Sequence, residues 1–531
     1  MIPSNIPITK FESNKKIFQI PQITSPPQKK HEKDIIYPIE KGVVYIGLHF
    51  NSDIENYMYY IYEPPVSPYI ASIIRAFPEY ITIHYKGGEI NSKLIMQYLD
   101  KFIEFNNFIV NRKAYYTILY YIERNMFHYG EITPILNDDL VEDISLTGVN
   151  KPIYVYHRYT GSIPTSLMFK SEEEANHFIF RLAEKAHRTV SYREPLLDAF
   201  LPEGHRLNLS LGNEVTAFGP TFTIRRFKMS PLTIFDLVNS GMVSYELLSY
   251  LWLQIENHRN VMIIGTTAAG KTTMLNNLLT FIKDVNKLVT IEDTHELYID
   301  HDNWVATITR PGVGIKGSSG IEMGEVDIMT LLKVSLRQRP EYLVVGESRG
   351  EETQILFQAM ATGHTGLATF HATDIQSFVS RIENAPISLP RSMLTLLSDI
   401  VIMQAYVEKM VEKRRVKEIA EIAGYDQTKN QLQFVSAFRY DPVTDSFITD
   451  TSAPGYKAIA TLHHISTMDV YREVRRRAEF LSTLEKLYKG KISNKELHKF
   501  VQVYHLLKDV EVVEFPIYLK RYETYIKEGK V

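Results

Sequence analysis

The sequence predicts an α/β protein with a parallel-sheet domain in its C-terminal half and a smaller mixed α/β domain before it. Between residues 241 and 450, apolar runs typical of buried strands alternate with helical patterns, which indicates a parallel α/β core. One such run, 261–264, leads through a glycine-containing loop into a helical pattern from Thr273 to Phe281. Between 133 and 240, strand patterns and one amphipathic helix pattern lack this regular alternation.

Composition limits the class of protein. A chain of 531 residues has room for two to four domains, and 44% hydrophobic with 23% charged residues is ordinary for a globular protein. The formal net charge of −3 gives no overall drive toward nucleic acid. The chain has no cysteine, which excludes disulfides and cysteine-based zinc sites. No apolar run approaches the ~18 residues of a membrane span, and the N-terminus lacks an apolar signal core. We therefore expect a cytoplasmic protein that meets a membrane only through partners.

Shifts in composition and pattern divide the chain into five expected segments. The first carries several prolines without helical periodicity and is expected to be a flexible arm. The last is helical and charged. Its cluster of Arg472, Arg475, Arg476 and Arg477 is expected to be a solvated helix face, with contact to a neighbouring subunit or an acidic partner as the alternative. The segments are the arm (1–36), an N-terminal α/β domain (37–132), a mixed α/β domain (133–240), the parallel core (241–450) and the helical region (455–531).

Apolar spacing places the expected elements. Helical spacing predicts helices over about 94–102, 115–126 and 175–186. Ser171 with Glu174, and Ser493 with Glu496, have the spacing of a capping box at a helix start. The expected strands are Val43–Phe50, Tyr57–Tyr62, Ile153–Tyr159, His205–Leu211, Thr221–Phe227, Val261–Gly265, Leu288–Asp293, Tyr342–Glu347, Gly366–Ala372 and Asp399–Val407, followed by an antiparallel edge pair, Val416–Tyr425 and Gln431–Tyr440.

The segment GTTAAGKT fits the phosphate-loop pattern G-x-x-x-x-G-K-[ST] at every fixed position. Its two glycines let the backbone curl, so that successive N–H groups and a helix N-terminus point at phosphate oxygens. The lysine adds a full charge for the β- and γ-phosphates, and the following hydroxyl is placed to bind Mg²⁺. A chance match in a Gly/Thr-rich turn is the alternative, which the flanking strand and helix disfavour. The residues expected to hold the nucleotide are Gly265, Thr266, Thr267, Ala268, Ala269, Gly270, Lys271, Thr272 and Thr273, with Thr272 also a metal ligand.

Hydrolysis of a nucleotide also needs carboxylates that act on water and on the metal. Glu292 and Asp293 end one predicted strand, and Glu347 follows four apolar residues of another. The carboxyl ends of parallel strands are where such sheets bind ligands. We expect Glu347 to hold Mg²⁺ through water or to polarise the attacking water. For each carboxylate, a helix cap or a surface ion pair is the alternative.

Histidines and arginines near the core strands complete the candidate set. His364 and His371 lie in one glycine-rich segment and are expected to sense the γ-phosphate or to bridge to a neighbouring subunit, with a buried core role as the alternative. The stretch Arg310–Asp327 is expected to be a mobile loop. An arginine can neutralise charge on the transferring phosphoryl group. The candidates are Arg337 and Arg339 before the Glu347 strand, and Arg206, Arg225 and Arg226 on the preceding domain, where a structural role is equally open.

Four motifs together resemble the secretion ATPase superfamily, which powers type II and type IV secretion, conjugation and type IV filaments. They are GTTAAGKTT, the acidic box TIEDTHE, RPEYLVVGESRG as Walker B, and the histidine box ATGHTGLATFHAT. Upstream, VEDISLTGVNKPIYVYHRYTGSIPT, HRLNLSL and FTIRRF resemble the archaeal branch, which includes the archaellum motor ATPase and pilus-assembly ATPases. The resemblance is good over about 142–440 and poor at both ends.

The resemblance implies a RecA-like P-loop ATPase domain at 241–450 behind a PAS-like domain at 133–240. It implies that Lys271 and Thr272 bind phosphate and Mg²⁺, that Glu292 is the general base, and that Glu347 is the Walker B glutamate. His371 matches the histidine-box residue. It also implies a homohexamer, with ATP between the two domains, on a polytopic membrane platform protein at the inner face of the cell membrane. Two departures stand out: the four-cysteine zinc module of bacterial type II members is absent, and Ser348 replaces an apolar residue.

Three functions follow from these observations. The favoured one is an ATP-hydrolysing ring motor that assembles or rotates a filament or serves a secretion machine. A nucleic-acid translocase or helicase on a similar core is the alternative, which the acidic net charge disfavours, so no nucleic-acid partner is expected. A nucleotide-dependent scaffold without turnover is the third, against which Glu292 and Glu347 argue. The motifs do not distinguish archaellum rotation from pilus assembly or secretion.

Overall fold

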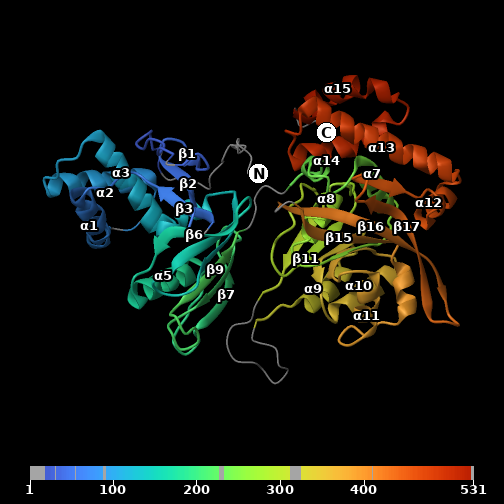
Figure 1. Ribbon diagram of the computed structural model, residues 1–531, viewed down its shortest axis with the longest axis horizontal. Helices are drawn as coiled ribbons and strands as arrows, with labels where there is room; N and C mark the ends of the chain where they lie inside the picture. Colours follow the sequence, from blue (N-terminus) through green and yellow to red (C-terminus); the bar gives the residue numbers. More distant parts are fainter. Residues whose placement is uncertain are drawn as a thin grey trace. The chain divides into compact units, whose positions relative to one another are not determined.

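The computed structural model describes residues 18, 20–29, 31–53, 55–85, 87, 91–226, 232–310, 324–408 and 411–527, without the side chains of 407, 408, 411, 412 and 524–527. Residues 1–17, 19 and 30 of the predicted arm lie outside these ranges, as do Phe227 and most of the predicted loop Arg310–Asp327. Contrary to the prediction of a flexible arm, Phe18 and Ile23 are buried in apolar clusters and a strand begins at Ile35. Contacts divide the chain into two units, Met1–Lys228 and Met229–Val531 (Figure 1). Each unit is described by itself.

The first unit is built on a mixed sheet that holds nine strands within the described residues, in the order β1-β2-β3-β6-β5-β4-β9-β8-β7. Neighbouring strands are antiparallel except β3 and β6, which join in parallel at Tyr59 and Thr165. The strands are β1 Ile35–Glu40, β2 Val44–Asn51, β3 Asn56–Tyr62, β4 Val141–Leu146, β5 Pro152–His157, β6 Gly161–Met168, β7 Leu196–Phe200, β8 Arg206–Ser210 and β9 Thr221–Arg225.

Two groups of helices accompany this sheet. Helices α1 to α3 form a core of their own around Phe77, Leu99 and Ile118, as expected from their helical spacing. Helix α5 packs Phe178 and Ile179 into the core of the sheet. The helices are α1 Pro68–His84, α2 Ser92–Phe105, α3 Arg112–Ile122, its π-helical continuation Glu123–Phe127, a 3-10 turn Gly130–Ile132, α4 Thr133–Leu136 and α5 Glu172–Lys185.

The start of α5 differs from the predicted capping box. Ser171 caps the helix, because its hydroxyl accepts the backbone N–H of Glu174. The Glu174 carboxylate, however, accepts the N–H of Lys170 and not that of Ser171, so the reciprocal bond of the box is replaced by one a residue earlier.

A buried polar cluster ties the strands β1 and β3 to the chain before β4. The hydroxyls of Tyr37 and Tyr59 both donate to the Asp138 carboxylate, at 2.6 and 2.7 Å. Residues of both segments share one apolar core, so the sheet is continuous across the boundary predicted near residue 132. The division into five segments stays a prediction.

The second unit confirms the predicted parallel α/β core. Its sheet has the order β12-β11-β13-β14-β10-β15-β16-β17-β18 within the described residues. The first six strands are parallel and the last three antiparallel, which confirms the predicted antiparallel pair as β16 and β17. The pair is not at the edge as predicted, because β18 lies beyond β17. The strands are β10 Val261–Gly265, β11 Leu288–Glu292, β12 Trp304–Ile308, β13 Tyr342–Ser348, β14 Thr365–His371, β15 Asp399–Glu408, β16 Val411–Asp426, β17 Gln431–Asp441 and β18 Ser446–Thr449.

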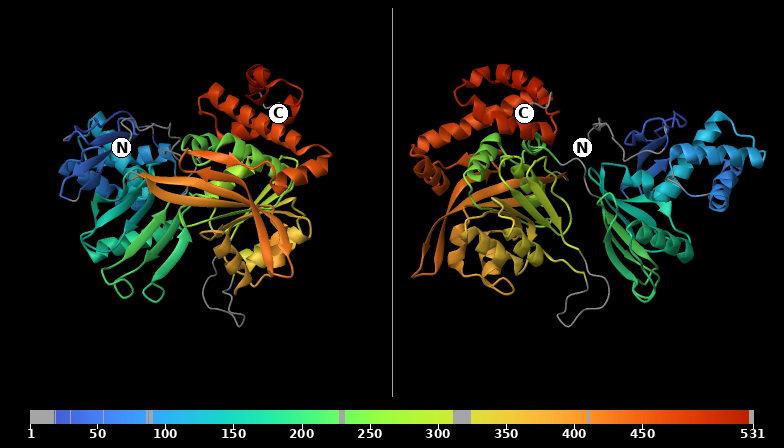
Figure 2. Two further views of the ribbon diagram at one scale, coloured as in Figure 1. Left: turned by 45° about the vertical axis from the view of Figure 1, so that its right-hand side comes forward. Right: turned by 180° about the vertical axis from the view of Figure 1, so that it is seen from behind.

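Both faces of this sheet are covered, because alternate residues of each buried strand point to opposite faces. On one face Met262 and Ile264 pack with α9, α10 and α11; on the other Val261 and Ile263 pack with α7, α8 and the C-terminal helices (Figures 1 and 2). The helices are α6 Ile234–Asn239, α7 Tyr245–Glu256, α8 Lys271–Leu279, α9 Ile328–Leu336, α10 Glu352–Ala361, α11 Ile375–Glu383, the 3-10 turn Arg391–Leu396, α12 Pro454–His463, α13 Thr467–Tyr488, α14 Asn494–Val503, the 3-10 turns Tyr504–Leu507 and Val512–Glu514, and α15 Phe515–Lys527.

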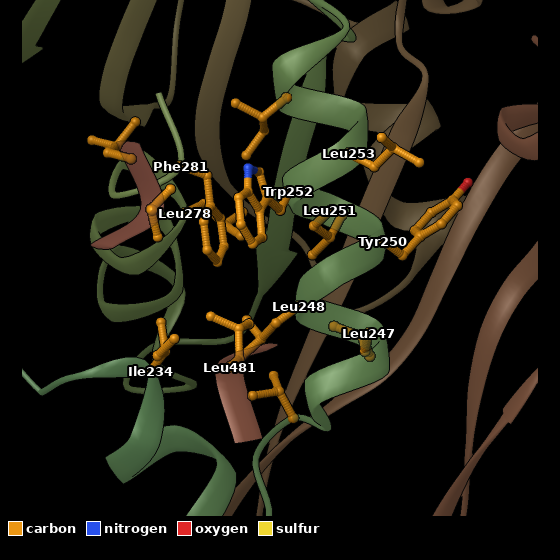
Figure 3. Packing of buried hydrophobic residues seen from close by; sticks show 14 of the residues in the cluster. Ile234, Leu247, Leu248, Tyr250, Leu251, Trp252, Leu253, Leu278, Phe281 and Leu481 are labelled. Atoms are coloured by element: carbon orange, nitrogen blue, oxygen red, sulfur yellow. The ribbon is translucent and has the colours of Figure 1, made fainter. Parts of the chain in front are cut away.

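The C-terminal helices belong to the core of this unit. Trp252 of α7 stacks on Phe281, with ring centroids 5.1 Å apart, and contacts Phe480 of α13 and Tyr504 (Figure 3). Within the described residues, none of the helices combines the length and the apolar composition that crossing a membrane requires.

The predicted solvated arginine face is wrong for two of its four residues. Arg472 and Arg475 are exposed, but Arg477 is 4% exposed and bridges Glu256 at 2.6 Å and Glu473 at 2.8 Å. Arg476 donates to the carbonyls of residues 507 and 510. Arg477 occupies an inward position of the helical stripe formed by Val470, Val474, Leu481 and Leu484.

A second buried polar cluster fastens the start of α12 to the sheet. Asp399 and Glu421 are cross-strand partners of β15 and β16, and both are buried. Glu421 accepts the hydroxyl of Tyr250 and the N–H of Gly455. Neither Asp399 oxygen has a hydrogen-bond partner among the described residues. Burial and the neighbouring Glu421 raise the pKa of Asp399 well above its ordinary value.

Candidate functional site

The predicted phosphate loop joins β10 to α8 at the carboxyl edge of the parallel strands. Gly270 has a φ of 91° and Ala268 a φ of 60°, which gives the loop the left-handed turns its curl requires. A Cβ on Gly265 would lie 2.8 Å from the carbonyl oxygen of Met403, so the close approach of the chain there needs glycine. Thr266, Thr267 and Ala268 are exposed, and Ala269 is buried beneath them.

Lys271 opens helix α8, and Thr272 and Thr273 share its first turn. The ammonium group of Lys271 donates to the carbonyl oxygen of Thr266 at 2.9 Å, so it lies folded against the inside of the loop. Burial lowers the pKa of Lys271, and the nearby Glu347 partly opposes that effect. The N-terminus of α8 and this ammonium group together make an anion site.

Glu347 lies at the end of β13, within electrostatic reach of Lys271 and His371. Its carboxylate accepts a hydrogen bond from the Arg349 guanidinium at 2.5 Å, and its side chain is 29% exposed. Burial works to raise the pKa of Glu347, but Arg349 and Lys271 outweigh it and lower the pKa. Glu347 is therefore an ionised carboxylate facing the phosphate loop.

Glu292 lies at the end of β11, the strand next to β13. Its carboxylate is 2% exposed and accepts the N–H groups of Glu296 and Leu297, both at 2.9 Å. His295 lies 3.2 Å from the other carboxylate oxygen and 6.0 Å, between ring centroids, from Trp304. In this structure Glu292 performs the capping function that the sequence left open, and its role as general base stays a prediction.

The two histidines of the predicted box lie at opposite ends of strand β14. His371 ends β14 next to Gly265 of β10, and its Nε2 lies 3.1 Å from the hydroxyl of Thr267. His364 precedes β14 and its Nδ1 lies 2.8 Å from the carbonyl oxygen of Pro340. Only His371 of this pair reaches the phosphate loop, while the contact of His364 is structural.

The candidate arginines lie elsewhere. Arg337 and Arg339 precede β13, so they are at the edge opposite to the phosphate loop. In the first unit, Arg206 and Arg225 are direct partners across β8 and β9 on an exposed face, and Arg206 bonds Asp198 at 2.8 Å. Arg226 differs from both, because its guanidinium donates to backbone carbonyls of 138 and 141. Their roles at a nucleotide stay predictions.

Two functional contacts were not predicted from the sequence. Arg349 and His295 bind the two candidate carboxylates, but neither was singled out. The signal available was the spacing of Glu347 and Arg349, which puts opposite charges two residues apart at a strand end. Among the described residues, three or more histidine, aspartate or glutamate side chains do not gather as a ready-made metal site.

The chain is similar to several known proteins. Residues 133–509 match the family model described as type II/IV secretion system protein. An uncharacterized protein of Methanocaldococcus jannaschii is 32% identical over 408 residues, covering 75% of this chain and 71% of its own. A probable conjugal transfer protein TrbB of Sinorhizobium fredii is 28% identical over 304 residues, covering 56% of this chain and 88% of its own. The crystal structure of a Legionella pneumophila ATPase, DotB, aligns over 69% of this chain and 92% of its own at 16% identity, with a TM-score of 0.37.

Proposed function

Since the chain belongs to the type II/IV secretion system protein family, we propose that it is an ATPase that powers assembly or rotation of a filament, or a related secretion machine. The observation that carries this proposal is the gathering of Lys271, Glu347 and His371 around one phosphate loop. ATP is the proposed substrate, with the protein cytoplasmic and held at the inner face of the cell membrane by a polytopic platform protein.

Each group at the site has a task in this proposal. The N–H groups of the loop and Lys271 bind the β- and γ-phosphates. His371, through its contact with Thr267, is placed to respond to the terminal phosphate. Glu347 and Glu292 supply carboxylates at neighbouring strand ends, where Glu292 would take a proton from the attacking water after leaving its caps.

The donor set fits Mg²⁺, which prefers oxygen ligands and binds through one or two carboxylates plus phosphates. The hydroxyl of Thr272 and, through water, the carboxylate of Glu347 would hold it. When bound, the ion neutralises phosphate charge and orients the phosphate oxygens.

Substitution of Lys271 tests the assignment. Lys271→Ala should abolish hydrolysis and weaken nucleotide binding, because the main countercharge to the phosphates is lost. Lys429→Ala is the matched control, since Lys429 is 74% exposed on the far antiparallel part of the sheet. Phosphate release and binding of fluorescent ADP are measured for both. Near-normal turnover in the Lys271→Ala chain would refute the site, and stimulation of the wild type by DNA, falling with salt, would favour the translocase alternative.

We further propose a homohexameric ring in which arginines of the first unit complete the site. Like charges directly opposite on a sheet cost stability, so Arg206 and Arg225 form a surface suited to an anion. Arg206→Ala and Arg225→Ala should each reduce turnover, by ~2–4 kcal/mol of transition-state stabilisation if one acts as a finger.

Light scattering with and without a non-hydrolysable analogue tests the ring, and specific activity should rise with protein concentration. A monomer that is fully active and indifferent to nucleotide would refute it.

A further inference from the structure

In the turn after β13, hydrogen bonds fix the backbone of Arg349. The Glu352 carboxylate accepts the backbone N–H groups of both Arg349 and Gly350, at 2.5 and 2.7 Å. The hydroxyl of Ser348 bonds that of Thr353 in the first turn of α10. The backbone of Arg349 is therefore fixed, whereas its side chain is 68% exposed and free to change direction.

The guanidinium of Arg349 lies within range of two sets of acids. Its present partner is Glu347, at 2.5 Å. Strand β11 lies beside β13 with Ile291 paired to Val345, so Asp293 follows β11 at the same end of the sheet as Glu347. Besides Glu347, Asp293 and Glu296 also raise the pKa of Arg349. Arg349 in turn contributes to lowering the pKa of Lys271, which places the guanidinium near the phosphate-binding ammonium as well.

The guanidinium of Arg349 thus pairs with Glu347, the carboxylate proposed to hold Mg²⁺. A guanidinium and a metal ion repel one another at one carboxylate, and Mg²⁺ requires near-ideal octahedral oxygen ligands. While it pairs with Glu347, Arg349 therefore weakens the water-mediated hold of that carboxylate on Mg²⁺. Asp293 and Glu296 follow the neighbouring strand β11 and are the other acids whose charge acts on this guanidinium.

We propose that Arg349 is a positioning residue that holds Glu347 while no nucleotide is bound and passes to Asp293 and Glu296 when a magnesium–nucleotide complex enters. The inference rests on the proposed ATP site and adds a step to it. Arg349 acts through Glu347 and does not itself contact the nucleotide. The exchange keeps Glu347 ionised and oriented between turnovers, and it makes Mg²⁺ binding compete with the ion pair.

The test measures metal dependence of binding, independently of hydrolysis. The full chain is mixed with fluorescent ADP and titrated with Mg²⁺, and the half-saturating Mg²⁺ concentration is recorded. An exposed ion pair is worth up to about 1 kcal/mol, so its removal in Arg349→Ala should lower the half-saturating Mg²⁺ about threefold to fivefold. Arg349→Lys, which keeps the charge, should return the value toward that of the wild type.

Arg439→Ala is the matched control, because Arg439 is 65% exposed and pairs with Glu418 at 3.7 Å on the antiparallel strands. It should leave the Mg²⁺ dependence unchanged. An unchanged or raised half-saturating Mg²⁺ in Arg349→Ala, with normal ADP binding at saturation, overturns the inference alone. Absence of ADP binding by the wild type overturns both the inference and the proposed function.

A double-mutant cycle tests the second partner. Asp293→Asn with Glu296→Gln should raise the half-saturating Mg²⁺ concentration in the wild-type background, because Arg349 then lacks its alternative acidic partners and stays on Glu347. The same pair should have much less effect in the Arg349→Ala background. Equal effects in both backgrounds would show that these acids attract the metal directly, which overturns their role as the acceptor of Arg349.

Discussion

Substitution of Arg477 should be among the most destabilising changes in the C-terminal helices. Its side chain is buried between Glu256 and Glu473, and its guanidinium lies 4.5 Å from the ring of Trp252. Truncation to alanine removes the countercharge of Glu256 and leaves that carboxylate, which is 21% exposed, with Lys283 as its remaining cation. A buried charge that loses its partner costs more than the pair contributed.

The pKa of Glu256 gives a magnitude. Burial works to raise it, but Arg477 and Lys283 outweigh burial and lower the pKa from its ordinary 4.5 to about 2. At about 1.4 kcal/mol for each factor of ten, the ionised Glu256 carboxylate stabilises the folded state by about 3 kcal/mol, net of the cost of its burial. The charge of Arg477 is the largest single cause of the lowering, and breaking a buried pair typically costs about 3–5 kcal/mol. We expect Arg477→Ala to lower the free energy of unfolding by about 3 kcal/mol.

Thermal unfolding followed by circular dichroism at pH 7 measures this loss, expected as a decrease in Tm of about 6–12 °C. Arg472→Ala, on the same helix but 73% exposed, should shift Tm by less than about 2 °C. Because the folded pKa of Glu256 is depressed, its stabilisation is present above pH 4.5 and is lost as the pH falls through about 2. The difference between wild type and Arg477→Ala should therefore shrink in acid. A Tm within 2 °C of the wild type at pH 7 would refute the reasoning.

Three further predictions concern other contacts of the second unit. Because the pKa of Asp399 is raised, the folded state holds a proton that the unfolded state releases, and stability falls as the pH rises above the ordinary pKa of 3.8. Asp399→Asn should therefore flatten the decline of the free energy of unfolding between pH 5 and 9, measured by urea titration. An unaltered slope would contradict this prediction. Gly455→Ala places a methyl group 2.1 Å from the Tyr250 hydroxyl oxygen and should cost about 1–3 kcal/mol in the same titration, whereas no loss would show that α12 shifts freely. Ser493→Ala removes one half of an intact capping box and should cost about 1 kcal/mol, with Ser452→Ala, in the exposed turn before α12, as the control.

The core strands were predictable because burial on both faces leaves a continuous apolar run. Val261–Gly265 is reproduced as β10, and Tyr342–Glu347 becomes β13 with one residue added. Strands β12 and β18 were missed because they lie at the two edges of the sheet, are short, and are partly exposed, so their residues carry little apolar signal. The phosphate loop was predictable for a different reason, since its chemistry fixes residue types at fixed spacing.

Side-chain pairings were much less predictable than strands. Arg477 is inward-facing although its charge suggests solvent, because its position in the stripe of α13 is decided by neighbours four and seven residues away. The Arg349–Glu347 pair depends on a turn geometry that Glu352 fixes, and no spacing rule encodes that contact. His364 and His371 look equivalent in the sequence. They differ because they lie at opposite ends of β14, so only His371 is at the end where the phosphate loop lies.

The two tryptophans of the chain sit where they can report on different events. Trp252 stacks on Phe281 beside Arg477, so its emission should follow detachment of the C-terminal helices from the core. Trp304 donates its indole N–H to Thr290 at 2.9 Å and faces His295, which binds Glu292, so its emission should respond when that carboxylate leaves its caps. Replacing one of them with phenylalanine isolates the other. The native chain, without any attached label, thus carries one intrinsic fluorophore for unfolding and one for the surroundings of Glu292.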